Sequence, residues 1–159
     1  MKIKIICIGS LKESYWREAE KEYLKRIKPY SQIEIEEYPD LPTPDGASQA
    51  IEDGIKNKEA EKILSKLKPS DFVCTLDLNK KEPDSVELSK QLENMMRMGG
   101  ASVTFIIGGS LGLSEGIRAR ANASISLSRL TFTHQMTRII LLEQIYRCFK
   151  ILNHEPYHK

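Results

Sequence analysis

The sequence has little of several features that mark specialised proteins. Its three cysteines, Cys7, Cys74 and Cys148, stand alone, and none belongs to a CxxC pair. An odd number of isolated cysteines argues against a disulfide framework. Together with an N-terminus that lacks a signal-peptide layout, it predicts a reducing, cytoplasmic location. Each cysteine lies in an apolar run, so we expect all three in the core.

Long apolar runs and strong charge are also missing. No run approaches the roughly 20 apolar residues that span a bilayer, so no membrane segment is predicted. The formal net charge is only +2, which is too small to indicate nucleic acid by itself. The 159 residues, 40% hydrophobic and 29% charged, fit one globular domain over residues 1–159, and no repeat or linker divides them.

The distribution of charge is more informative than its sum. Residues 101–159 carry seven Lys and Arg against three Asp and Glu, and between residues 101 and 149 every cation is an arginine. Arginine has a planar fork that suits phosphate or a buried ion pair. Both uses remain open for these arginines, and a helical Glu143–Arg147 pair is one structural alternative. The five are Arg118, Arg120, Arg129, Arg138 and Arg147.

Short Val/Ile-rich runs alternate with charged helical segments, ended by Pro29, Pro69 and Gly99-Gly100. This alternation predicts an α/β fold, with a mostly parallel sheet covered by helices on both faces. The expected strands are Lys2–Ile8, Ile33–Tyr38, Asp71–Leu76, Ala101–Ile107 and Ser124–Leu127. The expected helices are Glu13–Lys28, Gln49–Leu67, Asp84–Met98 and His134–Leu152, with a short helical piece after Gly112.

A glycine-rich stretch indicates where a ligand binds. The apolar strand FII ends in Gly108-Gly109, Gly112 follows, and the sequence SLSRLTF comes after the next strand. Ligands of open α/β sheets bind at the carboxyl ends of strands, and glycine lets them approach the backbone. The stretch contains no P-loop, GxGxxG fingerprint or nucleophile elbow, and the chain shows no metal-binding spacing. The sequence therefore predicts a backbone-lined pocket without a metal.

The C-terminal third adds two expectations. Apolar residues surround nearly the whole helix His134–Leu152, which predicts burial on several sides, one of them against a second copy in a homodimer. A central core helix in a monomer is the alternative. The terminal NHEPYHK contains a stacking ring in Tyr157, a proton donor or acceptor in His158, and the cation Lys159, so we expect this tail to order over a substrate.

These ordered blocks resemble one family from end to end. KI-x-I-x-x-IG-x-LKE-x-YW, TLD, F-x-IGGS-x-GL, SLS-x-x-TF-x-HQM-x-R, LLEQIYR-x-FKI and the final EPYHK are similar to the ribosomal large-subunit RNA methyltransferase H family of the SPOUT class. The resemblance implies a homodimer that methylates N3 of a pseudouridine in a large-subunit (23S) rRNA stem-loop, on the assembled ribosome. It also implies a SPOUT-type α/β-knot, with a C-terminal trefoil knot.

The resemblance further implies S-adenosyl-L-methionine as cofactor, held in the knot by three loops. By similarity its binding residues are Leu76, Gly108, Leu127, Ser128, Arg129, Leu130, Thr131 and Phe132. Leu130 and Thr133 depart from the methionine and proline that are frequent in the family. The first change conserves volume, and Thr133 is suited to cap the last helix.

Roles at the substrate are hypotheses. A proton must leave N3, so a base or a stabiliser of the deprotonated ring is needed. We assign His158 to that task, Tyr157 to stacking or hydrogen bonding, and Arg138, with Arg129, to phosphate or developing negative charge. Two alternatives stay open: a SPOUT enzyme that acts on tRNA or a ribose 2′-OH, and a SPOUT-fold RNA-binding or assembly factor without activity.

Overall fold

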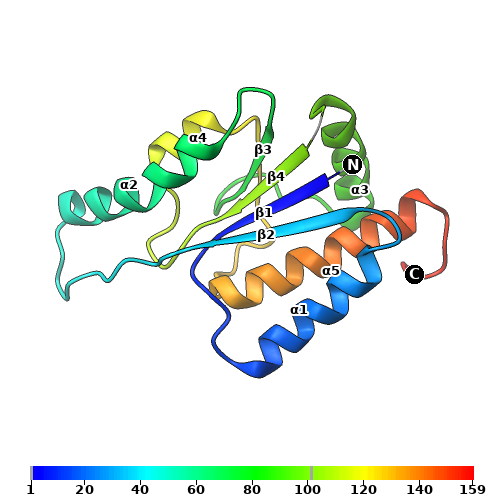
Figure 1. The fold of residues 1–159 in the computed structure, drawn as a ribbon, viewed down its shortest axis with the longest axis horizontal. Coiled ribbons are helices and arrows are strands. Elements are labelled where there is room, and N and C mark those ends of the chain that lie inside the picture. The colour runs from blue at the N-terminus through cyan, green and yellow to red at the C-terminus, as the bar shows by residue number, and fades with distance from the viewer. Residues whose placement is uncertain (1, 101) are drawn as a thin grey trace.

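The computed structural model describes residues 2–100 and 102–159, and Ala101, the expected first residue of a strand, lies outside them. Within these residues, strands and helices alternate along the chain (Figure 1). The strands are β1 (Lys2–Ile8), β2 (Gln32–Tyr38), β3 (Phe72–Leu76), β4 (Ser102–Ile107) and β5 (Ala123–Ile125). The helices are α1 (Ser14–Ile27), α2 (Gln49–Lys66), α3 (Ser85–Met98), α4 (Glu115–Arg120) and α5 (His134–Leu152).

The five strands form one sheet in the order β2-β1-β4-β3-β5. All four pairings between neighbouring strands are parallel, which confirms the predicted α/β class. The register aligns Ile5 of β1 with Phe105 of β4, and Leu76 of β3 with both Ile107 and Ile125. The carboxyl ends of β3, β4 and β5 therefore meet at one edge of the sheet.

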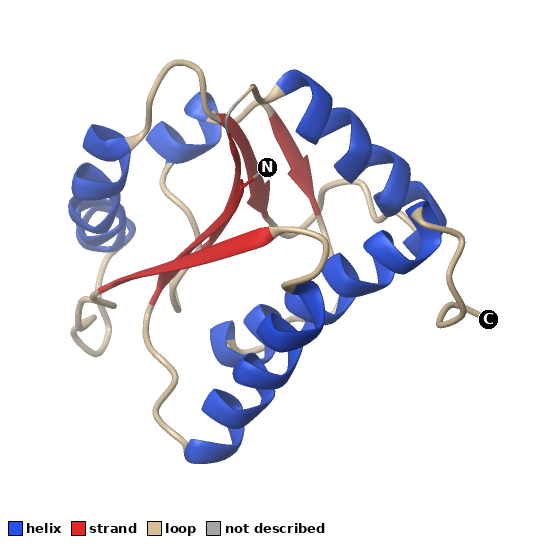
Figure 2. Ribbon diagram, turned by 45° about the vertical axis from the view of Figure 1, so that its right-hand side comes forward, coloured by secondary structure: helices blue, strands red, loops and turns tan. Residues whose placement is uncertain are grey.

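Helices cover both faces of the sheet, as predicted. Figure 2 shows α2 and α4 on one side and α1, α3 and α5 on the other. The alternation within β1 explains this, because Ile3, Ile5 and Cys7 pack in the larger core under α1, α3 and α5, whereas Ile6 and Ile8 pack in the smaller core under α2 and α4. The second half of β1, IICI, is buried on both faces and accordingly reads as a continuous apolar run.

Helix boundaries follow local capping chemistry. Ser48, Asp84 and Ser114 cap α2, α3 and α4 by accepting a backbone N–H with their side chains. Thr133 caps α5 in the same way and accepts from the backbone N–H of Met136 at 3.3 Å, which confirms its predicted cap. Beyond α3, Gly100 has a φ of +56°, the left-handed conformation expected of a glycine at a helix end.

The α5 helix is covered largely within one chain. It lies between α1 and α3 and beneath the sheet, with Leu141, Leu142 and Ile145 buried in the larger core. Its apolar circumference therefore has an intramolecular explanation, and the homodimer stays a prediction. All three cysteines are buried, as expected, and burial raises the pKa of Cys7 to about 12.

None of the helices in the two described ranges combines the length and the apolar character needed to cross a bilayer.

Candidate cofactor and substrate site

The loops that follow β3, β4 and β5 enclose a cavity of about 590 Å³ at the carboxyl edge of the sheet. Its volume lies in the range of small-molecule sites, roughly 300 to 1,000 Å³. Seven of the eight predicted cofactor-binding residues line it, namely Leu76, Gly108, Leu127, Ser128, Leu130, Thr131 and Phe132. The eighth, Arg129, is exposed and is not part of the lining. The structure thus brings together three loops that the sequence places far apart.

The glycine loop is shaped by its own close packing. A Cβ on Gly108 would lie 2.9 Å from the carbonyl carbon of Gly112, which has a φ of +84°. A Cβ on Gly109 would lie 2.7 Å from the Oδ1 atom of Asp40. The loop therefore needs glycine at both positions so that it can fold back on itself and pack against Asp40, which follows β2. This requirement holds whether or not a ligand approaches the backbone.

The loop after β5 is fixed by hydroxyl groups. Ser126 donates its hydroxyl to the carbonyl of Ser128 at 2.9 Å, and Ser128 accepts from the backbone N–H of Leu130 at 3.0 Å. The backbone N–H of Ser126 donates to the carbonyl of Lys81. The Leu130 side chain, 70% exposed, stands at the cavity wall. Side-chain bonds of this kind hold a loop without regular secondary structure.

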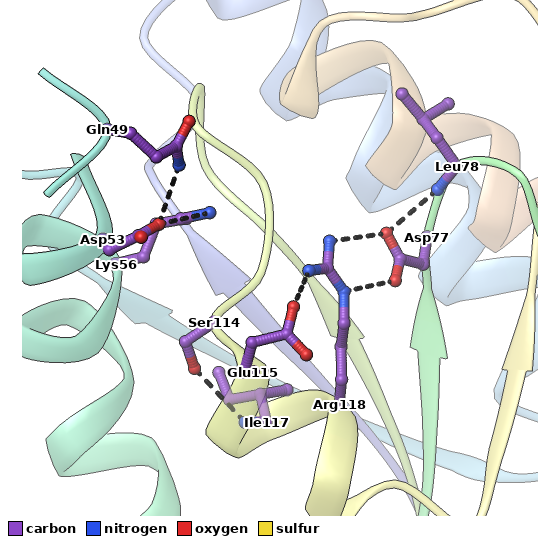
Figure 3. A network of polar contacts seen from close by, with 9 residues as sticks. All are labelled: Gln49, Asp53, Lys56, Asp77, Leu78, Ser114, Glu115, Ile117 and Arg118. Atoms are coloured by element: carbon purple, nitrogen blue, oxygen red, sulfur yellow. Dashed lines mark hydrogen bonds and ion pairs between the residues drawn. The ribbon is translucent and has the colours of Figure 1, made fainter.

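An ion pair joins helix α4 to the loop after β3 (Figure 3). Arg118 of α4 donates to both carboxylate oxygens of Asp77, which follows β3, at 2.7 and 3.2 Å. Asp77 also accepts from the backbone N–H of Leu78 at 3.0 Å, and Arg118 donates to Glu115 at 2.6 Å. The hydrogen bond to Asp77 raises the pKa of Arg118, so this side chain stays charged. Both Asp77 and Arg118 line the cavity.

His134 closes another side of the cavity. Its ring packs on Gly9, which has a φ of +116°, and a Cβ there would lie 2.6 Å from the ring. The His134 Nδ1 atom is buried, and no hydrogen-bond partner for it is found among the described residues. Burial lowers the pKa of His134 below 6.5, against the opposing effect of Asp40. The ring is therefore neutral at physiological pH.

Arg138 lies elsewhere than its predicted role requires. It is only 1% exposed and pairs with Glu20 at 3.1 Å and with Glu37 at 2.8 Å. It also donates to the carbonyl of Gly9 at 3.1 Å. This placement leaves no exposed guanidinium to hold an RNA phosphate, because burial of an arginine requires paired carboxylates such as these. Arg138 instead holds the loop after β1 in place through its bond to the Gly9 carbonyl.

The C-terminal tail is docked on the end of α5. Glu155 accepts from the Tyr30 hydroxyl and from the Lys150 ammonium, each at 2.6 Å. Tyr157 donates its hydroxyl to Glu143 at 3.1 Å and packs edge-on against Tyr146. These contacts order the tail without any substrate, as an intramolecular structure.

His158 lies beside a second cavity of about 470 Å³. This cavity is bounded by the start of α3 and the middle of α5, and it shares Ser126 and Leu127 with the larger cavity. The guanidinium of Arg147 lies 3.3 Å from the His158 Nδ1 atom and 4.6 Å from the centre of the Tyr157 ring. His158, which is proposed for substrate chemistry, thus lies next to the predicted cofactor loop.

The remaining three arginines differ in how far they are engaged within the chain. Arg147 pairs with Glu143, as expected for a helical pair, and Arg120 donates to the carbonyls of Lys68 and Asp71. Arg129 has no hydrogen bond or ion pair in the part of the chain that the structure describes. Only Arg129, among the five arginines, is therefore exposed and unengaged.

Sequence reasoning did not place the ionisable residues Asp77, Arg118 and His134 in the cavity wall. Asp77 and Arg118 are 41 residues apart, so no local spacing reveals that they pair. The aspartate directly after a buried strand, at the carboxyl edge, was the available signal. The contact of His134 with Gly9 has no local signal either, since these residues lie at opposite ends of the chain.

Comparison with known proteins agrees with this geometry. A family model described as predicted SPOUT methyltransferase matches residues 1–158. Relatives named ribosomal RNA large subunit methyltransferase H are 48% identical in Desulforamulus reducens, 50% in Clostridium botulinum strain Alaska E43 and 45% in Enterococcus faecalis. Each comparison covers all of this chain and 99 to 100% of the relative. With a family model over nearly its whole length and relatives this similar, the chain belongs to the SPOUT methyltransferase family.

Proposed function

We propose that this protein transfers a methyl group from S-adenosylmethionine to N3 of a pseudouridine in a large-subunit rRNA stem-loop, on the assembled ribosome. One observation carries the proposal: three loops from the carboxyl ends of β3, β4 and β5 converge on a single cavity. They do so in a chain that is 45 to 50% identical to proteins named ribosomal RNA large subunit methyltransferase H.

The residues present fit such a cofactor. Leu76, Leu127 and Phe132 supply apolar side chains that suit the faces of an adenine ring, while the loops offer backbone N–H and C=O groups for its edge. The two wall residues of opposite charge, Asp77 and Arg118, neutralise each other. Small-molecule sites commonly combine apolar walls with a few placed polar groups.

When bound, the cofactor supplies an activated methyl group on a sulfonium, so positioning provides much of the rate. The protein must then orient the base and accommodate the charge left when the N3 proton leaves. A target in a loop enters a pocket at little unstacking cost. We assign Arg129, which is exposed within the loop after β5, to contact with RNA phosphate.

The contact of His158 with Arg147 refines the role of this histidine. Arginine has only donors, so in this contact the His158 Nδ1 atom accepts from Arg147, and Nε2 is left to carry an N–H. In this position His158 offers an N–H donor. We therefore propose that it stabilises the negative charge on a carbonyl oxygen of the deprotonated base. Tyr157 positions the tail through Glu143 and the ring of Tyr146.

Two further features belong to the proposal. By family resemblance, the segment after β5 threads a loop as a trefoil knot before α5 returns beneath β1 and β4, with which it is in contact. We also propose a homodimer, to which the exposed apolar side chains Leu130 and Met136 contribute. Light scattering that finds a monomer at micromolar concentration would exclude the dimer.

The decisive test is mass spectrometry of rRNA fragments from ribosomes incubated with the protein and isotopically labelled S-adenosylmethionine. We expect one labelled methyl group on one pseudouridine of the ribosomal rRNA. Protein-free rRNA should be methylated more slowly or not at all. Titration calorimetry with the same cofactor separates this function from a non-catalytic RNA-binding factor. Absence of heat from a folded sample would favour that alternative.

The role of His158 is tested with paired variants. His158→Ala removes the donor and should lower kcat by at least about tenfold, whereas His158→Gln keeps an N–H donor and should recover part of the rate. Cofactor affinity should remain unchanged in both. Equal rates for the alanine variant and the wild type would refute the assignment.

A further inference from the structure

We propose that the Asp77–Arg118 ion pair sets how strongly the cavity discriminates between the methyl donor and its demethylated product. The inference rests on the proposed function, because it assumes that the cavity between the three loops holds S-adenosylmethionine. It assigns a specificity role to two residues for which the family resemblance implied no role.

The first step concerns the charges of the cavity. Among the lining residues that the structure describes, only Asp77 and Arg118 carry a full charge. His134 also lines the cavity, but burial lowers its pKa and keeps it neutral. The electrostatic potential inside the cavity therefore depends chiefly on how well these two opposite charges cancel.

The second step concerns the geometry of their cancellation. Arg118 donates to both oxygens of Asp77 through Nε and Nη2, which is the bidentate arrangement that brings the two charge centres closest. The Asp77 side chain is 10% exposed and that of Arg118 is 33% exposed. Water screens such a pair incompletely. If one partner is removed, the other becomes an uncompensated charge in the wall of the cavity.

The third step concerns the ligands. S-adenosylmethionine and S-adenosylhomocysteine share the adenosine, the amino group and the carboxylate, and they differ by one methyl group and one positive charge on sulfur. All shared contributions cancel in the ratio of their dissociation constants. That ratio therefore reports the potential at the sulfur, whereas a general loosening of the loops weakens both ligands together.

The magnitude follows from the size of the cavity. A volume of about 590 Å³ puts a bound charge within about 10 Å of the pair. For unit charges at that separation and an effective dielectric constant of about 40, Coulomb's law gives roughly a fourfold change in affinity. Arg118→Met, which leaves the Asp77 carboxylate, should raise the preference for the donor about fourfold. Asp77→Asn, which leaves the guanidinium, should lower it about fourfold.

The experiment is calorimetric titration of both ligands into the wild type, the two single variants and the double variant Asp77→Asn/Arg118→Met. The double variant carries no net change in charge, so its ratio should return to the wild-type value. Glu115→Gln serves as a matched control, because Glu115 contacts Arg118 with a side chain that is 87% exposed, and its ratio should change less than about twofold.

Opposite shifts in the two single variants, with recovery in the double variant, would support the inference. Thermal unfolding of each variant checks that it is folded at the temperature of titration. If the wild type binds both ligands but the ratio is constant, or moves in the same direction in both single variants, this inference fails and the proposed function stands. If the folded wild type binds neither ligand, both the proposed function and this inference are refuted.

Discussion

Replacing Gly9 with alanine should destabilise the protein strongly for two independent reasons, backbone strain and a steric clash with His134. Gly9 directly follows β1 and has a φ of +116°, a conformation that residues with a Cβ rarely adopt. The new Cβ would also lie 2.6 Å from the Cε1 atom of His134, far inside an ordinary contact. His134 begins α5 and lines the cavity, so relieving this contact would displace a residue of the cavity wall.

The expected size can be worked out. Backbone strain of this kind costs about 1 to 3 kcal/mol, and forcing a methyl group into a packed contact costs about another 1 to 3 kcal/mol. We therefore expect the free energy of unfolding to decrease by about 3 kcal/mol. An unfolding entropy of about 2.1 cal/mol/K per residue is about 0.33 kcal/mol/K for 159 residues, so Tm should fall by about 9 °C.

Differential scanning calorimetry of the variant and the wild type measures this shift. Gly54→Ala is the matched control, because Gly54 lies inside α2 with open space where its Cβ would stand. That change should raise Tm by about 2 to 3 °C, since alanine favours helix by about 0.5 to 1 kcal/mol. If the Tm of Gly9→Ala lies within about 3 °C of the wild-type value, Gly9 and the His134 ring are not packed as closely as in this structure.

Three other variants test separate parts of the structure. Arg138→Met leaves Glu20 without its buried partner and the Gly9 carbonyl without a donor, so the free energy of unfolding from urea titration should fall by roughly 3 kcal/mol. Burial lowers the pKa of His134 below its ordinary 6.5, so below that pH the unfolded chain binds more protons and stability is lost as pH falls. His134→Gln should therefore flatten the decline of stability between pH 7.5 and 5.5; an unchanged slope would contradict a buried neutral ring. Glu155→Gln weakens the anchor of the tail on Tyr30 and Lys150, and limited proteolysis should cleave the tail faster with little change in Tm. Equal cleavage rates would show that this anchor does not hold the tail.

Much of the fold follows from periodicity. The expected helix His134–Leu152 has the observed bounds of α5, and Thr133 caps it as its side chain allows. The other elements agree within one or two residues, because apolar spacing and capping residues are local signals. The position of the cavity was also predictable, since strand ends in a parallel sheet share one edge.

The order of the strands and the partners of the charged groups were not predictable in the same way. Nothing near Lys2 indicates that it pairs with Ser102, and nothing near Arg118 indicates Asp77. We expected Arg138 at a substrate, whereas it pairs with Glu20 and Glu37. The pattern of arginines along the sequence does not distinguish a phosphate contact from a buried ion pair. Such information resides in contacts between distant residues.

The central position of β1 has a consequence for how the chain is made. Its register pairs Lys2 with Gln32 on one side and with Ser102 on the other. During synthesis β1 therefore meets one neighbour about thirty residues later and the second only after about a hundred residues. Pairings of such long range are slow to form. Until then an apolar strand edge stays open, and nascent-chain chaperones are the cellular means of covering it. The cavity is lined by residues from Leu76 to Thr137, so it can form only after Thr137 has been synthesised.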